Sequence, residues 1–232
     1  MPLGLPATAD IVIIGGGVMG ASTAYHLAKR RAGAVLLLER DAYFGQEATG
    51  RCAGGVRYQF ATEVNVRLSM ASLPMLESFR DETGIDSNYR KCGYLFALTN
   101  GDDVIAFQRN VRMQNALGVR TEWLDGDEVR RRLPTMRFPD ALAGTFHARD
   151  GLADPNSVVM GYVQRARQLG ATARTDVEVT AIETAGGRVW GVRTSYGRVA
   201  CRHVVDAAGP WLAVVGAMAS SPERGADATW PP

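Results

Sequence analysis

Residues 15–20 form the pattern Gly-x-Gly-x-x-Gly, in which glycine spacing suits one kind of binding chemistry. The motif is Gly15-Gly16-Gly17-Val18-Met19-Gly20, and it lies between the aliphatic run Asp10–Ile14 and residues at helical spacing. Such glycines permit a tight turn, a close approach of backbone to a pyrophosphate, and close packing of helix on strand. The free N–H groups and the dipole of the helix N-terminus hold a diphosphate without lysines. The motif therefore predicts a dinucleotide site.

A carboxylate follows at the distance that such a site requires. Glu39 ends a second aliphatic run, Ala34–Leu38, about 20 positions beyond the motif, where a carboxylate can accept hydrogen bonds from ribose hydroxyls. It would also repel a 2′-phosphate. The alternative is a glycine-rich turn of an unrelated α/β protein with Glu39 in solvent. The motif does not distinguish NAD from FAD, because both contain the adenosine diphosphate that it grips.

The segment after the second run bears on the choice of cofactor. Residues 48–57 read ATGRCAGGVR, where a simple NAD-binding domain would proceed to another helix. Small residues let the backbone approach a flat ring closely. Thr49 could bond a phosphate or ribityl oxygen, and Arg51 could counter charge on the pyrophosphate or on a reduced flavin. An ordinary flexible loop with exposed arginines is the alternative.

The residues available for chemistry on a substrate are few. Arg57 and Tyr58 follow the glycines, where they could face a substrate carboxylate over the flavin, and they are the only catalytic candidates. Cys52 is expected to be a small residue beside a ring rather than a redox group. The histidines have no partners at metal-ligand spacing, so we expect packed or exposed side chains and no metal; they are His26, His147 and His203.

Three stretches together resemble the FAD-dependent amine and amino-acid oxidoreductases of the D-amino-acid oxidase, glycine oxidase and sarcosine oxidase beta-subunit type. They are DIVIIGGGVMGASTAYHLA with LLLER, then EATGRCAGGVR, and DGLADPNSVVMGYVQRARQLGA running through VEVTAI to VVDAAGPW. They span about residues 9–215 and look like the amino-terminal part of that family. The resemblance implies an α/β fold: a Rossmann-like FAD-binding domain with an incomplete, mainly antiparallel α+β substrate-binding part.

The resemblance also implies an activity and a set of cofactor contacts. The activity is oxidation of the C–N bond of an amine or N-methyl amino acid to an imine, by hydride transfer to FAD. The implied contacts are the Gly15–Gly20 loop; Glu39 and Arg40 at the adenosine ribose; Thr49, Gly50 and Arg51 near the diphosphate and flavin; the Val179 backbone at adenine; and Ala208 and Gly209 beside the ADP moiety. No histidine lies in the loop, and Cys52 matches no covalent-attachment motif, so non-covalent FAD is expected.

The sequence departs from the family at its carboxyl end. Family members continue past this point to complete the substrate-binding sheet, and Gly216–Pro232 no longer resembles them, so a truncated chain is expected. One alternative is a non-catalytic fragment, or a subunit that needs a second chain to complete the flavin site. Another is an NAD-dependent dehydrogenase.

The elements that must position these residues follow from hydrophobic spacing. A β-α-β unit is expected over residues 10–38, with a long functional loop at 40–60. Later helices are expected at 102–117, 127–133 and 156–168, with one beginning at Thr62, and strands at 94–98, 143–148, 177–183, 187–194 and 198–205. We assign residues 9–60 and 150–215 to a discontinuous FAD-binding domain, 61–149 to a partial substrate or cap domain, and 216–232 to a disordered tail.

Composition narrows the range of partners. The 232 residues carry 26 basic and 24 acidic side chains, a net charge of +2, so nucleic-acid binding has no electrostatic basis. The amino terminus lacks the pattern of a signal peptide, and apolar runs are too short to span a membrane. The three cysteines form no C-x-x-C pair. A cytoplasmic protein that binds a small amine or amino acid is expected, with a possible partner subunit.

Overall fold

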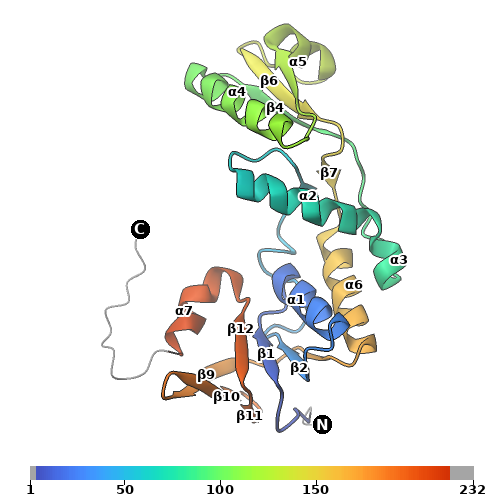
Figure 1. The fold of residues 1–232 in the computed structure, drawn as a ribbon. Helices are drawn as coiled ribbons and strands as arrows, with labels where there is room; N and C mark the ends of the chain where they lie inside the picture. Colours follow the sequence, from blue (N-terminus) through green and yellow to red (C-terminus); the bar gives the residue numbers. More distant parts are fainter. Residues whose placement is uncertain (1–3, 220–232) are drawn as a thin grey trace. The chain divides into compact units, whose positions relative to one another are not determined.

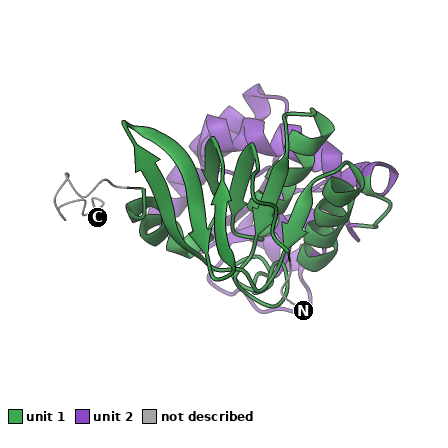
Figure 2. Cartoon of the chain, turned by 90° about the horizontal axis from the view of Figure 1, so that it is seen from below, with its two compact units in different colours: residues 1–52, 83–86, 155–232 green, residues 53–82, 87–154 purple. Residues whose placement is uncertain are grey.

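The computed structural model describes residues 4–219, which divide into two compact units (Figures 1 and 2). Within these residues, unit 1 comprises 4–52, 83–86 and 155–219, and unit 2 comprises 53–82 and 87–154. The observed division places 53–60 and 150–154 in unit 2, whereas the predicted FAD-binding domain included them. Among the described residues, no helix is both long enough and apolar enough to cross a bilayer.

Unit 1 is built on a parallel sheet with the strand order β12-β1-β2-β8. Its strands are β1 (Ile11–Ile14), β2 (Val35–Leu38), β8 (Thr172–Arg174) and β12 (His203–Asp206). The two central strands are buried along their whole length, as their continuous aliphatic runs require. Helices α1 (Val18–Lys29) and α6 (Pro155–Gln168) pack together through Tyr25 and Tyr162, whose ring centroids are 5.3 Å apart. The predicted β-α-β unit is confirmed.

A second, antiparallel sheet lies in the same unit. It consists of β9 (Val179–Ala185), β10 (Arg188–Thr194) and β11 (Gly197–Ala200). Gly186 and Gly187, with φ of +58° and +73°, make the tight turn between β9 and β10, as the sequence predicts. Buried residues of both sheets, with Val177 from the connection between β8 and β9, form one hydrophobic core that includes Val12, Leu36, Val192 and Val199.

Two predictions for the carboxyl-terminal part are wrong. The single strand predicted at 198–205 is two strands, because the chain bends at Arg202 and leaves the antiparallel sheet for the parallel one. The N–H groups of Arg202 and His203 both donate to the Asp10 carbonyl and fix that bend. The predicted disorder from Gly216 begins too early, since α7 (Leu212–Ala217) extends through it, anchored by buried Val215. Residues 220–232 of that predicted tail lie outside the described residues.

Unit 2 contains an antiparallel sheet with the order β4-β6-β5 and a short two-stranded pair. The elements are β3 (Gly55–Val56) paired with β7 (Gly151–Leu152); β4 (Tyr94–Leu98), β5 (Glu122–Asp125) and β6 (Ala143–His147); and the helices α2 (Glu63–Glu77), α4 (Gly101–Ala116) and α5 (Gly126–Arg132). Helix α3 (Phe79–Thr83) begins in unit 2 and ends in unit 1. Asn100 and Asp125 cap the N-termini of α4 and α5 with side-chain oxygens.

Candidate functional site

The parallel strands of unit 1 end at one edge of their sheet. Ile14 pairs with Leu38 and with Asp206, and Leu38 pairs with Arg174. The segments that follow all four strands therefore begin side by side. In open parallel sheets, ligands bind outside this carboxyl edge. The structure brings the predicted cofactor residues of the first, second and last strands to this edge.

The glycine turn between β1 and α1 is packed too closely for side chains. Gly15 has φ of +106°, and a Cβ atom there would lie 2.5 Å from the carbonyl oxygen of Ala207, just beyond β12. A Cβ at Gly20 would collide with the carbonyl oxygen of Gly15. Gly17 is the N-cap of α1 and makes no side-chain capping bond. The glycine turn before α1 thus presents backbone, and the helix begins with Val18 and Met19.

Glu39 lies against this turn. Its Oε2 accepts a hydrogen bond of 2.6 Å from the Gly16 N–H, and its Oε1 accepts one of 3.0 Å from the Asp41 N–H. The carboxylate is therefore held where the second strand meets the glycine turn. Next to it, the Arg40 guanidinium carbon lies 4.0 Å from the ring centroid of Trp211, which is in the 3-10 helix η1 (Gly209–Trp211).

The loop after β2 folds back onto the start of α1. The Thr49 Oγ1 accepts a 3.2 Å hydrogen bond from the Val18 N–H, so its hydroxyl caps the first turn of the helix from outside. A Cβ at Gly50 would collide with the Gly45 carbonyl oxygen, so a side chain has no room there. Arg51 is exposed and forms an ion pair of 2.9 Å with Glu47.

Val179 and the residues after β12 complete the set. The Val177 N–H donates to the Glu39 carbonyl at 2.9 Å, which ties the segment that leads into β9 at Val179 to the residue that follows β2. The Ala208 N–H donates to Asp206 Oδ1 at 3.1 Å, and Gly209 has φ of +55°. Burial raises the pKa of Asp206, although the bond from Ala208 opposes this shift. The sequence analysis did not single out Asp206, although an acid at the carboxyl end of a predicted parallel strand was the available signal.

Together these groups fit the adenosine diphosphate half of a dinucleotide. The turn offers backbone amides and lacks side chains, as a diphosphate requires, and a helix N-terminus adds its dipole. The carboxylate of Glu39 suits ribose hydroxyls. All the predicted cofactor residues belong to unit 1, whereas the predicted catalytic candidates Arg57 and Tyr58 belong to unit 2.

Arg57 lies among aromatic rings of unit 2. Its guanidinium carbon is 5.1 Å from the ring centroid of Tyr94 and 5.3 Å from those of Phe60 and Phe96. Each of these distances is within the range of a cation–π contact. Ring faces thus hold the charged end of Arg57, and within residues 4–219 no carboxylate forms an ion pair with its N–H edges.

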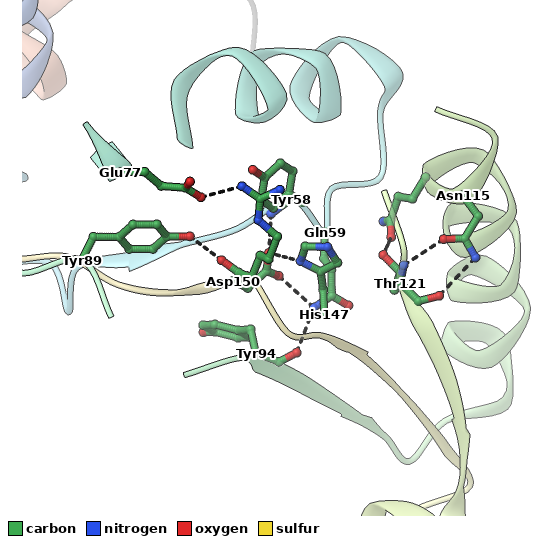
Figure 3. Close-up of polar contacts among 11 residues, drawn as sticks. Tyr58, Gln59, Glu77, Tyr89, Tyr94, Asn115, Thr121, His147 and Asp150 are labelled. Atoms are coloured by element: carbon green, nitrogen blue, oxygen red, sulfur yellow. Dashed lines mark hydrogen bonds and ion pairs between the residues drawn. The ribbon is translucent and has the colours of Figure 1, made fainter. Parts of the chain in front are cut away.

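Tyr58 is buried next to a carboxylate that the sequence analysis missed. Asp150 has no exposed surface, and its Oδ1 accepts a 2.8 Å bond from the Tyr58 N–H and lies 2.9 Å from His147 Nδ1 (Figure 3). The His147 ring packs on the Tyr58 ring, with centroids 4.9 Å apart. Burial raises the pKa of Tyr58, and it raises the pKa of Tyr89 to about 12.

His147 is packed, as expected for an isolated histidine, and its polar partner lies three residues further along the chain. The sequence gives one signal for Asp150: it is an acidic residue directly before the glycine that begins β7. This pattern is too common to single the residue out. Within residues 4–219, no three histidine, cysteine or acidic side chains are grouped as metal ligands. The three cysteines are free, and Cys52 donates its thiol to the Thr49 carbonyl at 3.1 Å.

Comparison with known proteins gives consistent results. The L-proline dehydrogenase of P. horikoshii superposes with a TM-score of 0.85 at 32% identity, over 93% of this chain and 56% of that one. Human mitochondrial sarcosine dehydrogenase is 30% identical over 93% of this chain and 24% of its own length. The mouse mitochondrial pyruvate dehydrogenase phosphatase regulatory subunit is 28% identical over 92% of this chain and 24% of its own length. The chain thus spans about a quarter of the length of these two mitochondrial relatives.

A family model described as FAD dependent oxidoreductase (DAO) matches residues 10–228, nearly the whole chain. This match selects FAD over the NAD alternative, which the glycine turn and Glu39 had left open. The Rossmann-like sheet, the glycine turn and the acid at its edge are thus those of a flavoprotein, and the chain belongs to the DAO family of FAD-dependent oxidoreductases.

Proposed function

We propose that this chain binds FAD non-covalently and serves the oxidation of a C–N bond in an amine or N-substituted amino acid. The observation that carries the proposal is the Gly15–Gly20 turn with Glu39 hydrogen-bonded against it, in a chain of the DAO family. We assign FAD binding to unit 1 and substrate binding to unit 2, close to the predicted division of 9–60 with 150–215 against 61–149.

The proposed cofactor contacts follow from the contacts in unit 1. The amides of the glycine turn face the diphosphate, and Glu39 accepts bonds from the adenosine ribose, which requires its Oε2 to share or release the Gly16 N–H. The Thr49 hydroxyl, which already meets the Val18 N–H, stands beside the diphosphate. The remaining proposed contacts are Arg40, Gly50, Arg51, the Val179 backbone, Ala208 and Gly209.

The proposed chemistry is the same for all substrates of this class. When bound, FAD would accept the electron pair and hydrogen of the C–H bond next to nitrogen, which leaves an iminium ion; a secondary amine then releases the nitrogen proton to water and becomes an imine. Before this step the substrate nitrogen must be neutral, because its lone pair forms the new C=N bond. The protein's part is to hold the substrate in place and to exclude water from the reacting face.

Arg57 is the proposed anchor for a substrate carboxylate. Its guanidinium keeps hydrogen-bonding edges while ring faces hold it, and a guanidinium fork matches a carboxylate. Two similar proteins are named for proline and sarcosine, which are both secondary amines with a carboxylate on the neighbouring carbon. This supports a secondary amino acid as the substrate class.

The test has two steps. The purified chain is mixed with FAD, and its visible spectrum is recorded after removal of free cofactor; a retained flavin band is expected. Sarcosine, dimethylglycine, L-proline and glycine are then added without oxygen, and bleaching of the flavin band is expected with at least one of them. Absence of a retained flavin band would contradict FAD binding by this chain.

A second candidate is a flavin-binding subunit without oxidoreductase activity. It is favoured by the similarity to a mitochondrial phosphatase regulatory subunit, which covers 92% of this chain. This candidate predicts a retained flavin band that no amine bleaches. If a second polypeptide completes the flavin site of such a subunit, an amine should bleach the flavin band once that polypeptide is added.

A further inference from the structure

A carboxylate of unit 2 is fully buried and is not used by the proposed chemistry. Asp150 has no exposed surface, and burying an ionised carboxylate is costly unless several donors compensate it. Its donors are the Tyr58 N–H at 2.8 Å on Oδ1, the Gln59 Nε2 at 3.0 Å on Oδ2, and His147, whose Nδ1 is 2.9 Å from Oδ1. Figure 3 shows these groups converging on the carboxylate.

Two of these donors belong to residues directly after Arg57. The Tyr58 N–H is part of the peptide bond that joins Tyr58 to Arg57, so Asp150 fixes the backbone at the point where the Arg57 side chain departs. Gln59 extends the restraint, because its Nε2 donates both to Asp150 and, at 2.9 Å, to the Tyr94 carbonyl (Figure 3). The ring of that same Tyr94 contacts the Arg57 guanidinium.

The arrangement separates the charge of Asp150 from the charge of Arg57. The carboxyl group of Asp150 is hydrogen-bonded by Tyr58, Gln59 and His147, while the guanidinium is held by the rings of Phe60, Tyr94 and Phe96. A direct ion pair would occupy the guanidinium edges. Bonds to the neighbouring backbone instead fix the place of Arg57 and leave those edges available.

We propose that Asp150 is a positioning residue that holds Arg57 in orientation for binding a substrate carboxylate. The proposal rests on the proposed function of Arg57 and deepens it. Asp150 touches neither substrate nor cofactor in this role; it acts through the 57–59 segment. Gln59 is its second link, and the Gln59 Oε1, which is buried without a hydrogen-bond partner among the described residues, takes no part.

The first experiment observes Arg57 itself in the whole chain and needs no substrate. The Nε–Hε resonance of Arg57, identified by its loss in Arg57→Lys, is expected to be displaced by ring currents of the three aromatic side chains. Asp150→Asn keeps the shape of the side chain and one hydrogen-bond acceptor. Its amide NH₂ group, however, would face one of the N–H groups that donate to the carboxylate. We expect the Arg57 resonance to move toward those of exposed arginines, while the dispersion of other amide signals is retained.

A matched control removes a different hydrogen bond in unit 2. Asp125→Ala deletes the bond of 2.8 Å to the Glu128 N–H at the start of α5, in which neither Arg57 nor the three rings around it take part, and should leave the Arg57 resonance in place. An unchanged resonance in a folded Asp150→Asn protein overturns the proposal. If that variant does not fold, Gln59→Met decides: a displaced resonance supports the proposal, and an unchanged one overturns it.

The second experiment separates this proposal from the proposed function. With the FAD-loaded protein, KM is measured for L-proline and for pyrrolidine, which lacks the carboxylate. Asp150→Asn should raise KM for L-proline roughly 10- to 100-fold with a smaller change in kcat, and should leave pyrrolidine unaffected. If Arg57→Ala leaves the ratio of the two KM values unchanged, the anchor role of Arg57 is wrong, whereas the resonance experiment still reports on positioning by Asp150.

Discussion

Glu39 is the residue on which we propose that cofactor binding most depends. Its two carboxylate oxygens accept bonds from Gly16 and Asp41, so a carboxylate is held at the sheet edge before the ribose arrives. Glu39→Gln retains one acceptor and removes the charge. Since hydrogen bonds to charged groups contribute about 1.5–3 kcal/mol, we expect the Kd for FAD to rise roughly 10- to 100-fold. Quenching of flavin fluorescence measures this change.

The control for this prediction is Glu63→Gln. Glu63 is exposed at the start of α2 in unit 2, where it pairs with Arg67 at 2.7 Å. Glu63→Gln removes the same charge from the unit that does not contain the glycine turn, so the Kd of this variant for FAD should match that of the unaltered protein. Equal affinity in the Glu39 and Glu63 variants would show that Glu39 does not bind the ribose.

Asp206 gives a prediction for pH. Burial raises the pKa of this carboxyl in the folded chain above its value in the unfolded chain. The folded state therefore holds the proton more tightly, and stability falls as pH rises from below the unfolded pKa through the folded one. Asp206→Asn keeps an acceptor for the Ala208 N–H and cannot ionise. We expect it to raise Tm at pH 7 more than at pH 4, as measured by thermal unfolding. An equal gain at both pH values would contradict the assignment.

At this scale, the sequence predicts residues whose chemistry is tied to a local pattern. Glu39 follows a glycine motif at a fixed distance, and the structure places it against that motif. Asp150 has no such pattern, because two of its three hydrogen-bond partners, Tyr58 and Gln59, lie about 90 positions away. A contact between distant segments depends on the tertiary fold, and no spacing within one segment reports it. The Arg40 contact with Trp211 is of the same kind.

Among elements, the junction between β1 and α1 is packed too closely for a side chain. A Cβ at Gly20 would meet the carbonyl oxygen of Gly15, which is backbone and cannot swing aside. We therefore expect Gly20→Ala to shift the turn, to destabilise unit 1 by about 1–3 kcal/mol, and to abolish retention of FAD. Urea unfolding and the visible spectrum measure the two effects.

Gly216 provides the control, because it also lies in a helix but has open space around it. Gly216→Ala should be neutral or should stabilise by about 0.5–1 kcal/mol, since alanine favours helix more than glycine. If Gly20→Ala behaves like Gly216→Ala, close packing is not the reason for the third glycine of the motif.

The sequence predicts elements well where apolar residues recur in a long enough run. The helix at 156–168 and the aliphatic strands β1 and β2 have such runs and are found as predicted. Three strands are too short to show an alternation of apolar and polar residues: β3 and β7 have two residues each, and β8 has three. The sequence also does not predict the break between β11 and β12. The alternation of apolar and polar residues continues through Cys201, whereas the bend depends on hydrogen bonds to the distant carbonyl of Asp10.

For the whole molecule, the division into two units predicts where a ligand acts. FAD or ADP that binds the folded form stabilises it by about 2.7 kcal/mol at a hundredfold excess over Kd. If the adenosine half is held by unit 1 alone, amide hydrogen exchange should slow in β1, β2 and β12 with either ligand. The sheet of β4, β5 and β6 in unit 2 should show no change with ADP. Protection by ADP confined to unit 2 would contradict the assignment.

The glycine turn touches residues from opposite ends of the chain, and this has a consequence for biosynthesis. Gly15 packs on Ala207, and β1 lies between β2 and β12, so the nucleotide-binding edge requires residues 11–207. At about 5–20 residues per second, a ribosome needs roughly 10–40 s to translate that interval. During this time one edge of β1 has no neighbouring strand, because β12 has not yet been made. A chaperone that covers this edge would then determine how much of the protein folds and binds its cofactor in a cell.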